Sequence, residues 1–334
     1  MRSIVRKSVR TLTVTAALAA SVLSAPVHAA ATPMKIGTCV WIGYGPFYVA
    51  DAMGMFKKHG LDVKLQMFND PALIPPAIAG GAVEGGMLTY DQVIGAVAQG
   101  DAQQVVMPID YSAGGDAIVA TSDIKDVKEF AGKKIAFNQL SPSDFLLSYA
   151  LKSHGLTDKA IQPVNMTPEA IPAAMVSGSV KIGVTYEPNV SQILSQGKGK
   201  YHVVYSSKQA PGLITDVLVF PPKYIKAHPD AVKAAIQSYL DGLEYMKKNP
   251  EAANKIIGKV LGVSADDVKA QMAGVHNLTL QEMPTVFAKS KDTTSFYTSG
   301  SLIGEILKAK GQIKRIPATE ETFDGQFVKA MTAK

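Results

Sequence analysis

Polar and aromatic side chains repeatedly follow short apolar segments of this sequence, at the points where a strand would end and a helix begin. The clearest pattern is Thr-Tyr-acid, which occurs at 89–91 and again at 185–187. In open α/β sheets, ligands bind beyond the carboxyl ends of strands, where helix N-termini present unpaired N–H groups. These positions therefore predict a binding site. The predicted ligand-binding residues are Trp41, Tyr44, Gly45, Thr89, Tyr90, Asp91, Asp110, Ser112, Gln139, Ser141, Ser143, Tyr186, Glu187 and Asp216.

The charges of these candidates favour a cationic or nitrogen-rich ligand. Four of them are acids, whereas the only arginine after residue 10 is Arg315. Because burying an unpaired carboxylate costs on the order of several kcal/mol, an N–H donor is its natural partner. Trp41 would add a stacking or cation–π contact of roughly 0.5 to 2 kcal/mol. We expect an amine, a guanidine-like compound, an aminopyrimidine, or a zwitterion whose anion is held by helix N–H groups at 141–143.

Several candidates also have a purely structural interpretation. Asp91 and Ser143 could be helix caps worth about 1 kcal/mol each. Trp41, Tyr90 and Tyr186 could be packing residues of the core. The pair at 114–115 indicates a hinge or a tight turn rather than a phosphate loop, because the longer Gly-rich pattern is missing.

The sequence offers little for catalysis. The histidines after residue 29 are scattered, and no HExxH, CxxC or GxSxG motif occurs. Cys39 lies inside an expected strand and is interpreted as a small core residue. We therefore expect a protein that is not an enzyme and that uses no cofactor and no metal.

From Lys35 onward, short apolar segments alternate with helical patterns, which indicates βαβ units and mainly parallel sheets. Expected strands at 34–42, 61–68, 82–89 and 103–112 alternate with helices at 46–60, 71–81 and 90–100. A second block repeats this order, with strands at 133–140, 161–167 and 180–186 and helices at 142–155, 168–178 and 187–197. The chain then becomes helical, with helices expected at 228–262, 264–275 and 301–313.

The two blocks are also similar in sequence, since residues 81–93 resemble residues 178–190. Two lobes built alike are the simplest account, although short βα units can resemble each other by chance. The chain would cross between lobes at 110–120 and 212–220. We expect one lobe to comprise 30–113 and 219–334, and the other lobe to comprise 114–218, with the ligand between them.

Residues 1–29 have the features of a secretory signal peptide. Four basic residues precede an apolar stretch of about a dozen residues, which is shorter than the roughly 20 that span a bilayer. Removing these four positive charges lowers the formal net charge from +6 to +2. No basic stripe remains, so a nucleic-acid partner is not expected. We expect a periplasmic protein that acts as a monomer.

The pattern P-x-Y-x-A-x-x-x-G-x-F-x-x-x-G-L-x-V from Pro46 to Val63, with AGGAVEGGM at 79–87 and DYSAGGDAIVA at 110–120, resembles periplasmic substrate-binding proteins of ABC importers. The most similar group is the nitrate/sulfonate/taurine class, which includes the NMT1/THI5-like proteins. The resemblance implies a type II two-lobed fold that closes around one small solute and delivers it to an inner-membrane permease with its ATPase. It implies that loops near 41, 89–91, 139–143 and 186–187 line the cleft.

Three alternatives stay open. The ligand could be a sulfonate, taurine or nitrate, as in other members of the class. A THI5-like pyrimidine-synthesis enzyme would need a His and Cys cluster for iron chemistry. An exported sensor would use the same hinged closure but present its closed form to a membrane receptor.

Overall fold

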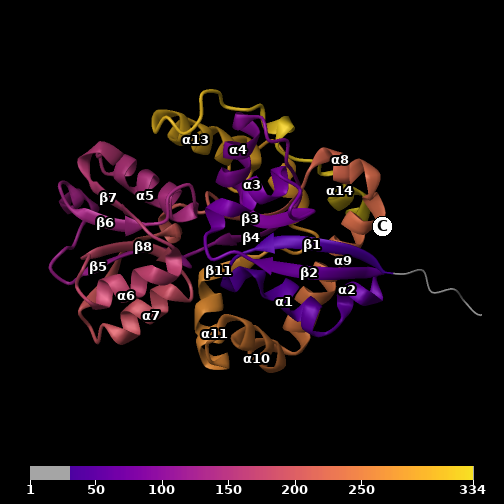
Figure 1. Ribbon diagram of the computed structural model, residues 1–334, viewed down its shortest axis with the longest axis horizontal. Coiled ribbons are helices and arrows are strands. Elements are labelled where there is room, and N and C mark those ends of the chain that lie inside the picture. The colour runs from indigo at the N-terminus through magenta and orange to yellow at the C-terminus, as the bar shows by residue number, and fades with distance from the viewer. Residues whose placement is uncertain (1–30, 334) are drawn as a thin grey trace, which may run out of the picture. The chain divides into compact units, whose positions relative to one another are not determined.

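The computed structural model describes residues 31–333, which form one compact unit with two β-sheets. The predicted signal peptide lies outside the described residues. Figure 1 shows the two sheets with helices on both faces of each. The first sheet has the order β11 (Val275–Asn277), β4 (Gln104–Ser112), β10 (Thr215–Phe220), β3 (Gly85–Thr89), β1 (Thr32–Thr38), β2 (Leu61–Met67). The second has the order β7 (Gln162–Asn165), β6 (Lys134–Phe137), β8 (Ile182–Tyr186), β5 (Asp116–Thr121), β9 (Tyr201–Ser206).

The two sheets have the same internal plan, which confirms the predicted two-lobed α/β fold. Strand β1 pairs in parallel with β2 and β3, and β6 pairs in parallel with β7 and β8. In the first sheet the antiparallel strand β10 is inserted beside β3, and in the second sheet the antiparallel strand β5 is inserted beside β8. We call the part built on the first sheet lobe 1 and the part built on the second sheet lobe 2.

The inserted strands come from the two crossings of the chain between lobes. β4 of lobe 1 continues through 113–115 into β5 of lobe 2, and β9 of lobe 2 continues through 207–214 into β10 of lobe 1. The expected crossings at 110–120 and 212–220 thus each contain a strand that the sequence interpretation did not identify. Because all of β10 pairs with β3 and β4, we propose that lobe 2 ends before Thr215.

Helices cover both faces of each sheet (Figure 1). In lobe 2, α5 (Pro142–Ser153) lies on one face, and α6 (Ile171–Val176) and α7 (Asn189–Gln196) lie on the other. In lobe 1, α3 (Ile74–Ala79) packs on β3, and α4 (Tyr90–Gln99) packs on α13 (Phe296–Ala309). The opposite face carries α1 (Gly45–Ala52), α2 (Met55–Lys58), α9 (Pro229–Lys248), α10 (Pro250–Leu261) and α11 (Ala265–Gln271). The remaining helices are α8 (Pro222–Ala227), α12 (Met283–Phe287) and α14 (Gln326–Thr332).

Two expected long helices are each divided in the structure. The helix expected at 46–60 stops at Ala52, because Gly54 adopts a left-handed φ of 68° before α2 begins. The helix expected at 228–262 is interrupted at Asn249, since Pro250 has no N–H to donate and restricts the residue before it. Both corrections concern local backbone chemistry and leave the order of elements unchanged.

Apolar side chains from both lobes form one main core. Buried residues such as Ile36, Met87 and Leu218 come from neighbouring strands of lobe 1. A smaller cluster of lobe 2, including Val119 and Met175, lies under α6 and α7. Within residues 31–333, no helix has both the length and the apolar character needed to span a membrane.

Candidate functional site

A small cavity lies between the facing strand ends of the two sheets. We call it the central cavity. Thr89 ends β3 and Tyr186 ends β8, and each pairs across its sheet with an acid of the inserted strand, Asp216 or Asp116. The cavity therefore lies at the carboxyl ends of the parallel strands, as expected. Its walls are Cys39, Trp41, Tyr44, Pro71, Leu88, Thr89, Gln92, Asp116, Pro142, Tyr186 and Asp216.

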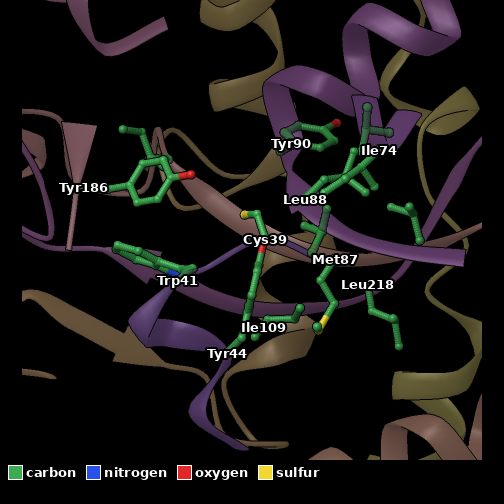
Figure 2. Packing of buried hydrophobic residues seen from close by; sticks show 14 of the residues in the cluster. Cys39, Trp41, Tyr44, Ile74, Met87, Leu88, Tyr90, Ile109, Tyr186 and Leu218 are labelled. Atoms are coloured by element: carbon green, nitrogen blue, oxygen red, sulfur yellow. The ribbon is translucent and has the colours of Figure 1, made fainter. Parts of the chain in front are cut away.

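The aromatic wall of the central cavity is formed by residues of both lobes. Trp41, which is 3% exposed, lies edge-on to Tyr186 with ring centroids 5.8 Å apart and planes at 87°. Its indole Nε1–H donates to both carboxylate oxygens of Asp110, at 3.3 and 3.4 Å. Figure 2 shows the hydroxyl of Tyr186 directed toward Cys39. That hydroxyl oxygen has no hydrogen-bond partner within residues 31–333. An edge-on pair of this kind closes the cavity on one side while leaving a polar group inside it.

Two buried carboxylates, Asp116 and Asp216, line the same cavity. A third, Asp110, accepts from Trp41 and pairs with Asp216 across the sheet. Asp110, Asp116 and Asp216 are each at most 3% exposed. Asp216 accepts a hydrogen bond from the Tyr44 hydroxyl at 2.6 Å, whereas the Oδ1 atom of Asp116 has no partner among the described residues. In the part of the chain from 31 to 333, none of the three forms an ion pair with a Lys, Arg or His.

Burial governs the protonation of these carboxyl groups. Desolvation raises the pKa of Asp116 to about 7, partly offset by a hydrogen bond from Ser112. Desolvation also raises the pKa values of Asp110 and Asp216, and the repulsion of Asp110 raises the pKa of Asp216 further. Low-dielectric surroundings thus disfavour the charged carboxylates in the absence of a cation. A cation in the cavity would compensate them.

Two predicted residues, Asp91 and Ser141, line a neighbouring cavity instead. Ser141 is the N-cap of α5 and accepts from the Ser143 N–H at 3.2 Å. Ser143 is fully buried, and its Oγ atom has no partner among the described residues. Ser112 lies at the crossing, 2.7 Å from Ser207 between Oγ atoms, and accepts from the Asp116 N–H.

Four predicted residues lie away from the central cavity. The Tyr90 ring stacks on Phe296 with centroids 3.9 Å apart, and its hydroxyl lies 2.7 Å from Thr322 Oγ1. Figure 2 shows this hydroxyl pointing away from Tyr186. A side chain at Gly45 would meet α10 rather than the cavity. Gln139 is exposed, and Glu187 accepts from the backbone and side chain of Ser191 at the start of α7.

Asp116, Cys39, Gln92 and Pro142 line the cavity but were not among the predicted ligand-binding residues. Asp116 was missed because its strand was interpreted as a connection between lobes. One signal was available: Asp-Ala-Ile-Val at 116–119 resembles Asp-Val-Leu-Val at 216–219. Both segments place an acid at the start of an inserted strand.

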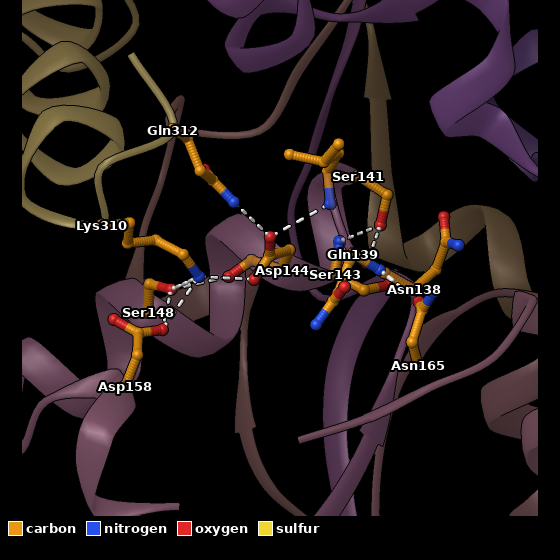
Figure 3. A network of polar contacts seen from close by, with 11 residues as sticks. Asn138, Gln139, Ser141, Ser143, Asp144, Ser148, Asp158, Asn165, Lys310 and Gln312 are labelled. Carbon is orange, nitrogen blue, oxygen red and sulfur yellow. Dashed lines mark hydrogen bonds and ion pairs between the residues drawn. The ribbon is translucent and has the colours of Figure 1, made fainter. Parts of the chain in front are cut away.

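A polar network ties the segment after α13 to lobe 2 (Figure 3). The Lys310 ammonium donates to Asp144 Oδ1 at 2.5 Å, to Ser148 Oγ at 2.6 Å and to Asp158 Oδ1 at 2.9 Å. The Gln312 amide donates to Asp144 Oδ2 at 2.7 Å. We call these contacts the Lys310 network.

Two similar lobes, joined by two crossing strands around a cavity, define a two-lobed solute-binding protein. Residues 41–253 match the family described as NMT1/THI5 like, so the chain belongs to this family. The taurine-binding periplasmic protein of Escherichia coli is 30% identical over 250 residues, covering 71% of this chain and 76% of that protein.

Solved structures agree on the fold. The periplasmic aliphatic sulphonate binding protein of Escherichia coli has a TM-score of 0.70 at 16% identity, covering 87% of this chain and 92% of that chain. The periplasmic nitrate-binding protein of Synechocystis PCC 6803 has a TM-score of 0.68 at 14% identity, covering 90% of this chain and 88% of that chain. The taurine-binding relative is a binding protein, which supports a binding role rather than catalysis.

Proposed function

We propose that this protein is the periplasmic receptor of an ABC importer and that it captures a small solute carrying a cationic nitrogen. The observation that carries this proposal is that Asp116 and Asp216 line the central cavity as buried carboxylates, without a cationic partner in residues 31–333. The family match supports the transport role, and the two crossings between lobes supply the hinge that capture requires.

An ammonium, guanidinium or aminopyrimidinium group would suit the side chains that line the cavity for three reasons. Its N–H groups can donate to Asp116 Oδ1, which is otherwise unpartnered. Its charge compensates carboxylates that are costly to bury unpaired. The rings of Trp41 and Tyr186 form part of the wall and can contribute cation–π attraction of about 1 kcal/mol.

A taurine-like zwitterion is the second candidate, and two observations favour it. Thr89 and Pro142, at the starts of α4 and α5, both line the cavity, and helix N-termini bind anions through free N–H groups. The taurine-binding protein is also a relative at 30% identity. The ammonium of such a solute would use the same carboxylates. Nitrate and simple alkanesulfonates lack a positive charge, and Arg315 is engaged with Glu321.

A ligand screen tests this proposal. We expect amines, guanidines, aminopyrimidines or taurine to raise the melting temperature, because a ligand that binds only the folded state stabilises it by mass action. Asp116→Asn should weaken binding of the identified solute by about tenfold or more in isothermal titration calorimetry, since hydrogen bonds to charged groups contribute about 1.5 to 3 kcal/mol. Asp266→Asn, the same change at an exposed position on α11, should have no effect. The proposal is wrong if alkanesulfonates or nitrate bind and no cationic solute does.

A further inference from the structure

A larger cavity adjoins the central one. This outer cavity has a volume of about 190 Å³ and lies between α3 and α4 of lobe 1, the start of α5, and the segment after α13. Gln92 lines both cavities. Residues adjacent in sequence line different cavities. Pro71 and Pro142 line the central cavity, whereas Ala72 and Ser141 line the outer one. The two cavities therefore meet at Gln92.

The Gln92 side chain forms the wall between the cavities. Its Nε2 group donates to the carbonyl oxygen of Pro71 at 3.0 Å and to that of Leu140 at 3.3 Å. Its Oε1 atom accepts from the Thr89 N–H at 3.3 Å. A solute longer than the central cavity would pass beside this amide.

Asp91 gives the outer cavity a buried carboxylate of its own. The residue is 5% exposed, and its Oδ1 atom has no hydrogen-bond partner within residues 31–333. Asp144 lines the same cavity but is already compensated by Lys310 and Gln312. Much of the remaining wall is apolar and suits a chain of methylene groups. This apolar part includes Pro75, Pro76, Ala96, Phe145, Leu307 and Ile313.

We propose that the outer cavity binds a second N–H donor group of the same solute, so that the solute is an elongated molecule with a cationic nitrogen at each end. One ammonium would lie beside Asp116 and Asp216, and the other would donate to Asp91 Oδ1. The intervening methylene chain would contact the apolar wall. The inference rests on the proposed function, because that function assigns the first ammonium to the central cavity.

Calorimetry with propylamine and a series of α,ω-diaminoalkanes of increasing length tests the inference. At one length, the diamine should bind at least about tenfold more tightly than propylamine, because it gains a charge-assisted hydrogen bond and apolar contacts. Asp91→Asn should remove this advantage while leaving the affinity for propylamine within about twofold. Asp116→Asn should weaken binding of both compounds.

Gly95→Leu provides an independent variant that fills the outer cavity. A Cβ atom at Gly95 meets nothing within 4 Å, and the residue lines the outer cavity from α4. Leucine is also a better helix former than glycine by roughly 1 kcal/mol, so the variant should fold. It should bind propylamine normally and lose the preference for the diamine.

The possible results separate the two proposals. If propylamine binds, Asp116→Asn abolishes that binding, and no diamine gains affinity, the outer cavity is not part of the solute site and only this inference is overturned. This inference is also overturned if Asp91→Asn and Gly95→Leu both still bind a diamine more tightly than propylamine. If no amine binds to the unmodified protein, the cationic solute of the proposed function is overturned as well.

Discussion

Asp110, Asp116 and Asp216 are the residues whose burial most needs an explanation. Buried carboxylates are normally paired, because the charged form loses its hydration. Here the donors to Asp110 and Asp216 are a tryptophan and a tyrosine, neither of which carries a positive charge. The raised pKa values favour the neutral acids, and this cost of charging them is what supports the proposed cationic solute.

The stability of the ligand-free protein should therefore fall as pH rises. The pKa of Asp116 is about 7 in the folded protein, against 3.8 in the unfolded chain, so the folded state binds more protons between these values. Its contribution to stability is fully present below about pH 4 and is lost as pH rises through about 7. Each unit of pKa difference corresponds to about 1.4 kcal/mol.

Urea unfolding of the unmodified protein and of Asp116→Asn, between about pH 4 and pH 8, measures this effect. The asparagine variant cannot titrate at this position. We expect the unmodified protein to lose a few kcal/mol more than the variant over this range. Parallel pH dependences of the two proteins would contradict the assigned role of Asp116.

At the level of single residues, part of the prediction coincides with the lining of the central cavity. Trp41, Tyr44, Thr89, Tyr186 and Asp216 were predicted and line the central cavity. Tyr90 was grouped with them because it repeats the Thr-Tyr-acid pattern, but its ring packs on Phe296. Side-chain direction at a helix start depends on what packs against that helix, and the C-terminal segment that packs there is more than 200 residues away in sequence.

Among the secondary-structure elements, α5 is linked to the end of α13 in two ways, by the Lys310 network just after that helix and by an exposed ion pair to it, which offers a matched comparison. The Lys310 and Asp144 side chains are only 11% and 5% exposed. By contrast, Lys152 and Glu305 join the same two helices at 3.9 Å with more than half of each side chain exposed. Only the buried pair should contribute measurably to stability.

We predict that Lys310→Ala lowers the free energy of unfolding by about 3 kcal/mol, because it leaves the buried Asp144 carboxylate without its cation. Lys152→Ala should change it by less than about 0.5 kcal/mol. Urea denaturation of both variants measures the difference. Equal effects of the two substitutions would show that the Lys310 network has no special role.

Elements were predictable where a periodic pattern was regular. The order of strands and helices in both blocks followed from alternating apolar segments, but β5 and β10 were not recognised as strands. Each of these strands pairs antiparallel with strands that are distant in sequence. Such pairing depends on where the chain crosses between lobes, and no local pattern specifies it. The breaks at Gly54 and Asn249 depend on single residues within otherwise helical patterns.

For the molecule as a whole, the backbone approaches its neighbours closely at the first crossing, where the proposed hinge lies. A Cβ atom on Gly115 would lie 2.6 Å from the Trp41 ring and 3.1 Å from the carbonyl oxygen of Gly274. A side chain at this position would keep Trp41 away from the crossing. The glycine pair at 114–115, interpreted from the sequence as a hinge or tight turn, lies between β4 and β5.

Gly115→Ala should therefore impair closure more than folding. We expect solute affinity to fall by about tenfold or more, since part of the binding energy would be used to displace the indole. Small-angle X-ray scattering should show a smaller decrease in radius of gyration on adding solute than in the unmodified protein. An unchanged decrease, with unchanged affinity, would contradict this role of the crossing.

The chain contains a single cysteine, and Cys39 is 6% exposed in the wall of the central cavity. Burial raises the pKa of its thiol, so that the reactive thiolate is scarce while the lobes are shut. Alkylating reagents therefore gain access mainly when the two halves separate. If the lobes open as proposed, the rate of Cys39 modification would follow that motion without any engineered label, and a tightly held solute would slow it.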